Sequence, residues 1–238
     1  MKAIILAAGR GSRLCKLTEN KPKCMVLAKG KTLLKWQIDA LTKAGINEIA
    51  VIKGYLAEKI SYSGIISFEN TEWATTNMVA SLLKADIMLK QNECIISYAD
   101  IIYPESTINI LLSNKEDDIV ITYNTQWLEI WEKRFDNPLE DAETFKIDKN
   151  GYLVEIGKKT DKISDIEGQY MGLLRFTPKG YSDILKVINQ KPEIISKLDM
   201  TSMLQMLILS GVKIKALPVE GNWFEIDNEK DLQLFSEV

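Results

Sequence analysis

The chain begins with a short apolar segment that runs directly into a glycine-rich loop. Residues Ala3–Leu6 are apolar, and Leu6-Ala7-Ala8-Gly9-Arg10-Gly11-Ser12-Arg13-Leu14 continues from them without a break. Small residues and glycines leave the backbone N–H groups bare, so a phosphate or a base can approach them closely. The stretch therefore predicts a ligand-binding loop at the end of a buried strand.

Two common phosphate-binding motifs fit this region poorly. A dinucleotide fingerprint needs a third glycine where the chain has Leu14, and an acidic residue where it has Lys53-Gly54. The string Gly30-Lys31-Thr32 matches the end of a P-loop, but the required glycine five residues earlier is Met25. Neither motif explains the loop.

A longer pattern remains, in which the loop is followed by Leu17-Thr18 and Pro22-Lys23. Arg13 offers a planar fork for phosphate oxygens, and Lys23 adds a point charge just after a proline that fixes the chain. A glycine turn with solvated basic side chains is the competing interpretation. The spacing of the arginine and the lysine favours a binding loop for a triphosphate.

Composition excludes several function classes. The 238 residues carry a net charge of −3 without a basic run, which argues against nucleic-acid binding. The chain has no histidine, so imidazole catalysis and histidine metal sites are excluded, and its three cysteines are too few and scattered for a disulfide framework. No apolar run is long enough for a membrane span. We expect a cytoplasmic monomer or homodimer that binds neither nucleic acid nor membrane.

The first half of the chain predicts a β-loop-α-β unit. The elements are a strand over 2–6, a helix over 32–44 ended by Gly45, and a strand over 48–52. Such a unit favours parallel strands with a right-handed crossover. Further strands are expected over 65–68, 94–98, 119–123 and 212–219, and further helices after Thr76-Asn77, over 199–210 and over 227–235.

The pattern changes after residue 125. Residues 126–177 contain a possible helix rich in Trp and Glu, then alternating segments such as GYLVEIG and QYMGLLRF. Alternation is typical of antiparallel strands, so these segments are expected to be antiparallel additions. The whole chain is expected to form one α/β domain with a mixed sheet.

The extended loop pattern resembles the signature of the nucleotidyltransferases that make sugar nucleotides and CDP-linked small molecules. That signature reads L-A-A-G-x-G-x-R-L-x-P-L-T, followed by P-K, and Lys16 stands where the family has its first proline. Further pieces agree in order along essentially the whole chain: Lys53-Gly54-Tyr55, Thr76-Asn77-Met78-Val79-x-Ser81-Leu82, Ser97-Tyr98-Ala99-Asp100, Glu155-Ile156-Gly157-Lys158 and Trp223-Phe224-Glu225-Ile226-Asp227.

The resemblance implies a three-layer α/β/α Rossmann-like nucleotidyltransferase domain over 1–238, with a mostly parallel sheet and a small antiparallel addition. It also implies that 1–125 mainly binds the nucleotide and 126–238 the acceptor. Mg²⁺ would be held by Asp100 and Asp227. The implied catalytic cations are Arg13, Lys23 and Lys158. The implied nucleotide-binding residues are Leu6, Ala7, Ala8, Gly9, Gly11, Ser12, Arg13, Gly54, Tyr55, Asn77, Ser81 and Ala99.

Some of these residues also have simpler interpretations. A carboxylate that ends a buried strand in an α/β sheet lies where ligands bind, which favours a metal role for Asp100 over a turn role. Asp227 could instead cap the last helix. Lys158 lies beside Lys159, and exposed pairs are usual for lysines.

A narrower resemblance lies over residues 127–144 and 167–173. These segments are similar to the cytidylyltransferases of capsular phosphoramidate synthesis, which implies the reaction of CTP with phosphoglutamine to give a CDP-linked product and pyrophosphate. The implied acceptor-binding residues are Trp127, Glu140, Asp141, Lys158, Glu167, Tyr170, Gly172 and Trp223.

Several alternatives remain open. The acidic residues near 140 could form a solvated loop; if they bind substrate, carboxylates beside aromatic rings suit a cationic amine. Arg134 or Arg175 could then meet a substrate carboxylate. The acceptor could also be phosphocholine, a phosphonate or, with UTP or dTTP, a sugar 1-phosphate. A nucleotide-binding regulatory protein without activity is a further alternative.

Overall fold

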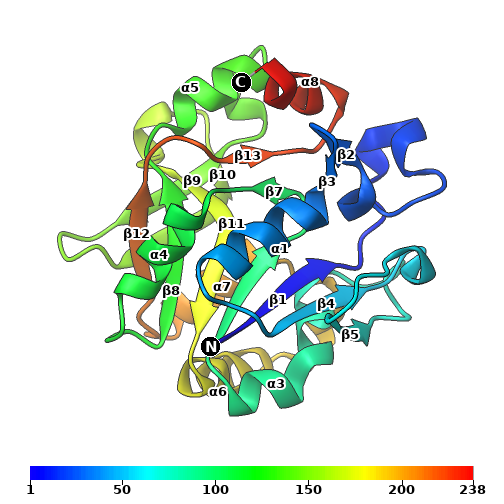
Figure 1. The fold of residues 1–238 in the computed structure, drawn as a ribbon. Helices are drawn as coiled ribbons and strands as arrows, with labels where there is room; N and C mark the ends of the chain where they lie inside the picture. The colour runs from blue at the N-terminus through cyan, green and yellow to red at the C-terminus, as the bar shows by residue number, and fades with distance from the viewer. Residues whose placement is uncertain (238) are drawn as a thin grey trace.

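A central mixed sheet with helices on both faces forms the body of the protein (Figure 1). The computed structural model describes residues 1–237. In spatial order, the seven strands are β12 (Lys215–Val219), β8 (Ile119–Asn124), β11 (Gln169–Phe176), β6 (Cys94–Tyr98), β1 (Lys2–Ala7), β4 (Ile49–Lys53) and β5 (Ile66–Glu69).

Most neighbouring strands in this sheet run parallel. β1 lies between β4 and β6, and all three are almost wholly buried apolar runs, as expected for strands covered on both faces. β5 continues the parallel set beyond β4, and β12 pairs parallel with β8. Only β11 runs antiparallel, to both β6 and β8. The predicted mixed, mostly parallel sheet is confirmed.

The sheet separates two apolar cores, one on each of its faces. Ile4 and Leu6 of β1 belong to the core shared with α2, α3, α6 and α7, whereas Ala3 and Ile5 belong to the core shared with α1, α4 and α5. This alternation follows from the two-residue period of a strand. The helices are α1 (Leu33–Lys43), α2 (Met78–Leu82), α3 (Asp86–Gln91), α4 (Glu105–Ser113), α5 (Trp127–Arg134), α6 (Pro178–Ile188), α7 (Met200–Leu209) and α8 (Glu229–Glu237).

Three two-stranded ribbons complete the fold. They are β2 (Leu27–Ala28) with β3 (Lys31–Thr32), β7 (Ile101–Ile102) with β13 (Phe224–Glu225), and β9 (Glu143–Ile147) with β10 (Leu153–Lys159), all antiparallel. The β9–β10 ribbon is the predicted small antiparallel addition. Within residues 1–237, no helix is long and apolar enough to cross a membrane.

Two sequence expectations need correction, and two helices were not expected. The helix expected after Asn77 is broken into α2, a 3₁₀ turn and α3, because Ala85 leaves the helical conformation. The segment QYMGLLRF is β11, which lies inside the main sheet rather than beside it. Helices α4 and α6 were not expected, although Thr177 caps α6 and Pro178 occupies its first turn, a usual helix-start signal.

Candidate functional site

The glycine-rich loop is shaped around Lys23. The loop leaves β1 after Ala7, and Gly11 adopts the left-handed conformation with φ of 69°. A Cβ atom on Gly11 would lie 2.6 Å from the Cβ of Lys23, so only glycine leaves room for the lysine stem. The Gly11 carbonyl accepts hydrogen bonds from the Leu14 N–H at 3.1 Å and the Thr18 hydroxyl at 3.1 Å, which fix the turn.

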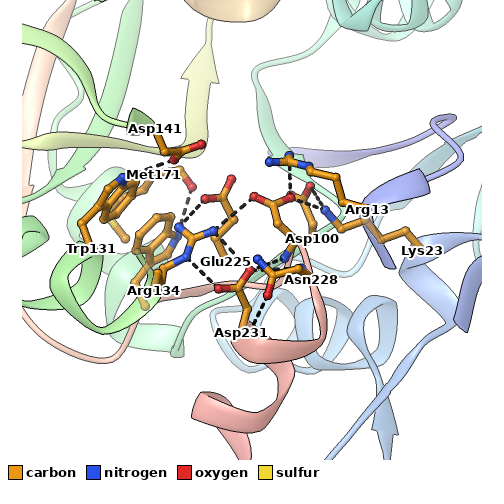
Figure 2. Close-up of polar contacts among 12 residues, drawn as sticks. Arg13, Lys23, Asp100, Trp131, Arg134, Asp141, Met171, Glu225, Asn228 and Asp231 are labelled. Carbon is orange, nitrogen blue, oxygen red and sulfur yellow. Dashed lines mark hydrogen bonds and ion pairs between the residues drawn. The ribbon is translucent and has the colours of Figure 1, made fainter. Parts of the chain in front are cut away.

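The ammonium group of Lys23 lies between two carboxylates (Figure 2). Its Nζ is 2.7 Å from Oδ2 of Asp100 and 2.6 Å from Oδ1 of Asp227. The same Asp227 oxygen accepts a hydrogen bond from Nη2 of Arg13 at 2.8 Å. Burial disfavours the charged lysine, but the two carboxylates outweigh burial and raise the pKa of Lys23. Lys23 therefore stays charged.

Backbone pairing brings Asp100 and Asp227 together, although they lie 127 positions apart in the chain. Asp100 follows β6, and the next residues form β7, which pairs with β13 just before Asp227. The Ile226 N–H also donates to the Asp100 carbonyl at 2.9 Å. Behind this ribbon, the buried Gln37 amide donates to the Ile101 carbonyl at 2.9 Å. The β7–β13 ribbon thus places Asp100 and Asp227, which flank its two strands, close together.

Glu225 completes a cluster of three acidic side chains. One oxygen each from Asp100, Glu225 and Asp227 can be chosen so that all lie within 4.8 Å of one another. Burial, together with the Asp227 carboxylate, raises the pKa of Glu225 to about 7, whereas Lys23 and two arginines outweigh burial and lower that of Asp227. Oδ1 of Asp100 is buried and has no hydrogen-bond partner among the described residues. An orphaned oxygen within a set of carboxylate oxygens fits a hard divalent cation such as Mg²⁺.

A cavity of about 290 Å³, here called the loop cavity, lies over the glycine-rich loop. Trp73, Thr76, Met78 and Tyr98 help to form its walls. It gathers most of the residues that the sequence predicted to bind a nucleotide or metal: Leu6, Ala7, Ala8, Gly9, Gly11, Ser12, Arg13, Lys23, Asn77, Ser81, Ala99, Asp100 and Asp227.

A second cavity of about 390 Å³, here called the acidic cavity, lies next to the loop cavity. The two cavities share Arg13, Met78, Tyr98 and Asp100 in their linings. The acidic cavity is further lined by Trp131, Asp141, Glu143, Thr144, Phe145, Ile156, Gln169, Tyr170, Asp199, Met200, Thr201 and Glu225. Two ligands bound in these cavities would therefore meet at Asp100 and Arg13.

Gly54 and Tyr55, predicted to bind the nucleotide, support the loop from behind. A Cβ atom on Gly54 would lie 2.5 Å from the Ala8 carbonyl oxygen, and the Tyr55 N–H donates to that oxygen at 2.9 Å. The Tyr55 hydroxyl donates to the carbonyls of Thr18 and Glu19. Direct contact of these two residues with a ligand stays a prediction.

Several predicted acceptor-binding residues lie outside the lining of the acidic cavity. Lys158 is 59% exposed and pairs with Glu155 at 2.6 Å. Glu140 is exposed, and the Glu167 carboxylate accepts the Ile147 N–H. The other three are packed: Trp127 and Trp223 lie in the core, and Gly172 lies against the Tyr98 ring with φ of 72°.

Asp141 and Tyr170 are the predicted acceptor residues that do line the acidic cavity. Asp141 accepts a hydrogen bond from the Trp131 indole at 3.2 Å, and the Trp131 ring stacks on Trp223. Glu143, one of the acidic residues that the sequence places near position 140, also lines this cavity, whereas sequence reasoning missed Asp199. Burial raises the pKa of Glu143, and the nearby Asp199 adds to the effect.

The expectation that Arg134 or Arg175 meets a substrate carboxylate is wrong, because both guanidinium groups are occupied inside the protein. Arg134 is buried against Glu225, Asp227 and Asp231. Arg175 contacts the Glu93 carboxylate and the Asp117 carbonyl at the opposite end of β11 from the site.

Comparison with known proteins places the chain in a family. CTP:phosphoglutamine cytidylyltransferase of Campylobacter jejuni subsp. jejuni serotype O:2 is 42% identical over 98% of this chain and 98% of its own length. 2-Aminoethylphosphonate cytidylyltransferase of Lancefieldella rimae is 34% identical over 44% of this chain and 45% of its own length. The structure of inositol-1-phosphate CTP transferase from T. maritima matches with a TM-score of 0.77 at 23% identity, over 99% of this chain and 95% of that one.

The structural match confirms the predicted Rossmann-like nucleotidyltransferase fold. Residues 3–158 also match the model of the MobA-like NTP transferase domain, and this range includes the glycine-rich loop, Lys23 and Asp100. The chain is a nucleotidyltransferase and belongs to the MobA-like NTP transferase family.

Proposed function

We propose that this protein is a Mg²⁺-dependent cytidylyltransferase that joins CTP to a small phosphorylated acceptor and releases pyrophosphate. The observation that carries the proposal is the meeting of the loop cavity and the acidic cavity at Asp100 and Arg13. A nucleotide and an acceptor in these cavities would bring their phosphates to one cluster of charged groups. The C. jejuni relative, similar over its full length, supports CTP as the nucleotide.

The loop cavity would hold CTP. The backbone of Ala8 and Gly9 would read the cytosine, and a Cβ on Gly9 would meet nothing within 4 Å among residues 1–237, so a base can approach closely. Asn77 and Ser81 would also face the base. The Asn77 amide accepts the Met78 N–H and donates to the Lys197 carbonyl, which leaves one hydrogen and one lone pair for a base edge.

Asp100 and Asp227 would hold Mg²⁺, with Glu225 within reach as a third oxygen ligand. When bound, the cation would polarise the α-phosphate and neutralise part of its charge. The Lys23 ammonium contacts the same two aspartates. It would therefore turn to the phosphates when Mg²⁺ and CTP enter.

The reaction would be a direct in-line displacement. An oxygen of the acceptor phosphate attacks the α-phosphorus of CTP, the bond from that phosphorus to the bridging oxygen breaks, and pyrophosphate leaves. A phosphate monoester has its second pKa near 6, so no general base is needed, consistent with a chain that lacks histidine. Lys23 would bridge the two reacting phosphates, and Arg13 would bind the leaving pyrophosphate.

The acidic cavity would bind the acceptor. Asp141, Glu143 and Asp199 line it beside the aromatic rings of Trp131 and Tyr170, which suits a cationic nitrogen. We therefore propose an acceptor that carries an amine as well as a phosphate, with phosphoglutamine as the best candidate. The names of the C. jejuni and L. rimae relatives, which act on phosphoglutamine and 2-aminoethylphosphonate, support this class.

The remaining acceptor residues are proposed to act around the acidic cavity. Lys158 would leave Glu155 to bind the acceptor phosphate. Glu140, Glu167, Trp127, Gly172 and Trp223 would shape the acceptor site from outside its lining. Residues 1–125 would serve mainly the nucleotide and 126–238 mainly the acceptor, within one domain.

The test is pyrophosphate release from each of CTP, UTP and dTTP, with Mg²⁺ and with phosphoglutamine, phosphocholine, a phosphonate or a sugar 1-phosphate. We expect turnover with CTP and an amine-bearing acceptor, and loss of that turnover with EDTA. The Asp100→Asn variant is expected to lose at least 100-fold in kcat, on the scale of a removed electrostatic contact. Turnover restricted to UTP or dTTP with sugar phosphates, or none with any pair, would contradict the proposal.

A further inference from the structure

Arg134, at the end of α5, is a buried arginine that contacts three carboxylates. Its side chain is only 3% exposed. Nη1 donates to Glu225 at 2.7 Å, Nη2 to Oδ2 of Asp227 at 3.2 Å, and Nε to Oδ1 of Asp231 at 2.9 Å (Figure 2). A guanidinium is a rigid planar fork, so these contacts fix directions as well as charge.

Asp231 contacts both the Arg134 side chain and the backbone at Asp227. Its carboxylate is 1% exposed, and its Oδ2 accepts the backbone N–H groups of Asp227 at 2.8 Å and Asn228 at 3.1 Å. Arg134 therefore holds the Asp227 side chain, while Asp231 holds both Arg134 and the Asp227 backbone. Burial disfavours the charge of Arg134, but Glu225 and Asp231 outweigh burial and raise its pKa, so the cation persists.

The two oxygens of Asp227 then have separate partners. Oδ2 is held by Arg134, and Oδ1 faces Lys23 and Arg13 in the loop cavity. Arg134 itself lines a different cavity, between α5 and α8. Arg134 is not among the described residues that line the loop cavity or the acidic cavity, and its contacts with the cluster are those with Asp227 and Glu225.

We propose that Arg134 is a positioning residue: it orients Asp227 and Glu225 so that one oxygen of each is presented to a divalent cation. The inference rests on the proposed function, because it assumes that the cluster binds a cation. Loss of a partner that orients a metal ligand usually weakens metal binding 10- to 100-fold. The planar fork, rather than positive charge alone, supplies the orientation.

The experiment compares Arg134→Lys with wild type, and Mn²⁺ binding followed by electron paramagnetic resonance is its main measurement. We expect Mn²⁺ to bind at least tenfold more weakly, and the half-saturating Mg²⁺ in turnover to rise by a similar factor. The KM for CTP at saturating Mg²⁺ should stay within about threefold of wild type. Asp231→Asn, which keeps the arginine but weakens its anchor, should shift both metal measurements in the same direction.

Arg175→Lys is the matched control. Arg175 is also buried, and it contacts Glu93 and the Asp117 carbonyl at the far end of β11. Its variant should lower the melting temperature without weakening Mn²⁺ binding. If Arg134→Lys and Asp231→Asn behave like this control, or if Arg134→Lys does not fold and Asp231→Asn binds Mn²⁺ normally, Arg134 is only structural and the inference is wrong.

Failure of the proposed function would look different. Wild-type protein that binds Mn²⁺ but transfers no nucleotide would contradict the proposed reaction, and the variants would still test the positioning role through Mn²⁺ binding. Wild-type protein that binds no Mn²⁺ would overturn both proposals, because Asp227 would then have no cation to meet.

Discussion

Substitution of Lys23 by Met removes one buried charge and keeps most of the stem volume. Lys23 contacts Asp100 at 2.7 Å and Asp227 at 2.6 Å. Asp227 retains two arginines, but Asp100 loses its salt-bridge partner. Removal of one member of a buried pair costs about 3–5 kcal/mol. Because the Asp100 side chain is 19% exposed, we expect the lower part of that range, about 3 kcal/mol.

For a chain of this size, that loss lowers the melting temperature by roughly 6–12 °C. Mg²⁺ should raise the melting temperature of Lys23→Met by more than it raises that of wild type, because in the variant the ion does not compete with an ammonium for the two aspartates. The measurement is thermal unfolding with and without an excess of MgCl₂, because a ligand that binds the folded state raises its stability as the ligand concentration rises. Lys31→Met, which breaks an exposed pair with Asp39, is the control and should change neither value.

The same variant tests catalysis. A unit charge about 4 Å from another is worth about 4 kcal/mol at an effective dielectric of 20, so loss of Lys23 from the transition state should lower kcat by about 10²- to 10³-fold. The KM for CTP should change far less, because Arg13 and the loop backbone still hold the triphosphate. The assay is pyrophosphate release over a range of CTP. An effect confined to KM, or equal Mg²⁺ stabilisation of variant and wild type, would refute this reasoning.

Four further outcomes are expected. Gly11→Ala should lower both stability and kcat, because the methyl group displaces the catalytic lysine; Gly45→Ala, which has φ of 84° and open space, should lower stability alone in the same unfolding and turnover assays. Burial and a neighbouring carboxylate raise the pKa of Glu225 from 4.5 to about 7, so its contribution to stability is complete below pH 4.5 and is lost as the pH rises to 7. Urea unfolding without divalent ions should therefore show that the free energy of unfolding of Glu225→Gln, relative to that of wild type, is higher at pH 8 than at pH 5. The pH slopes of the two proteins should differ by at most about 1.4 kcal/mol per pH unit. Parallel plots of stability against pH would contradict this expectation. Asp141→Asn should raise the KM for an amine-bearing acceptor about tenfold but leave the KM for CTP unchanged, since it removes a charge of about −1 from the acidic cavity. Lys158→Ala should raise the acceptor KM, and an unchanged value would remove this lysine from the site.

Local sequence decided the parts of the site that lie close together in the chain. Arg13 and Lys23 closely follow the glycines in the sequence, and their spacing indicated a phosphate-binding loop. Asp100 could be recognised because a carboxylate at the end of a buried strand in an α/β sheet lies at the ligand edge. The β1–α1–β4 unit followed from hydrophobic periodicity and from the terminating Gly45, because both signals are local.

Elements that depend on long-range pairing were not accessible in this way. The strand β11 alternates like an edge addition, yet it lies between β6 and β8, because sheet position is set by competition among all strands. Arg134 carried no signal that distinguished a substrate ligand from an internal anchor. Its three partners lie 91 to 97 positions away, so only the folded chain shows that its charge is already neutralised.

The loop, the family signature and the two aspartates that are proposed to hold the cation could all be recognised in the sequence. Only the folded chain shows that the loop cavity and the acidic cavity meet at Asp100, and that Glu225 joins the two aspartates with Arg134 behind them. These residues meet because the β7–β13 ribbon and the hydrogen bond from the Ile226 N–H to the Asp100 carbonyl place residues 224–227 beside residues 100–102. Backbone N–H and C=O groups can pair whatever the side chains are, so the amino-acid sequence does not show which residues such pairing brings together.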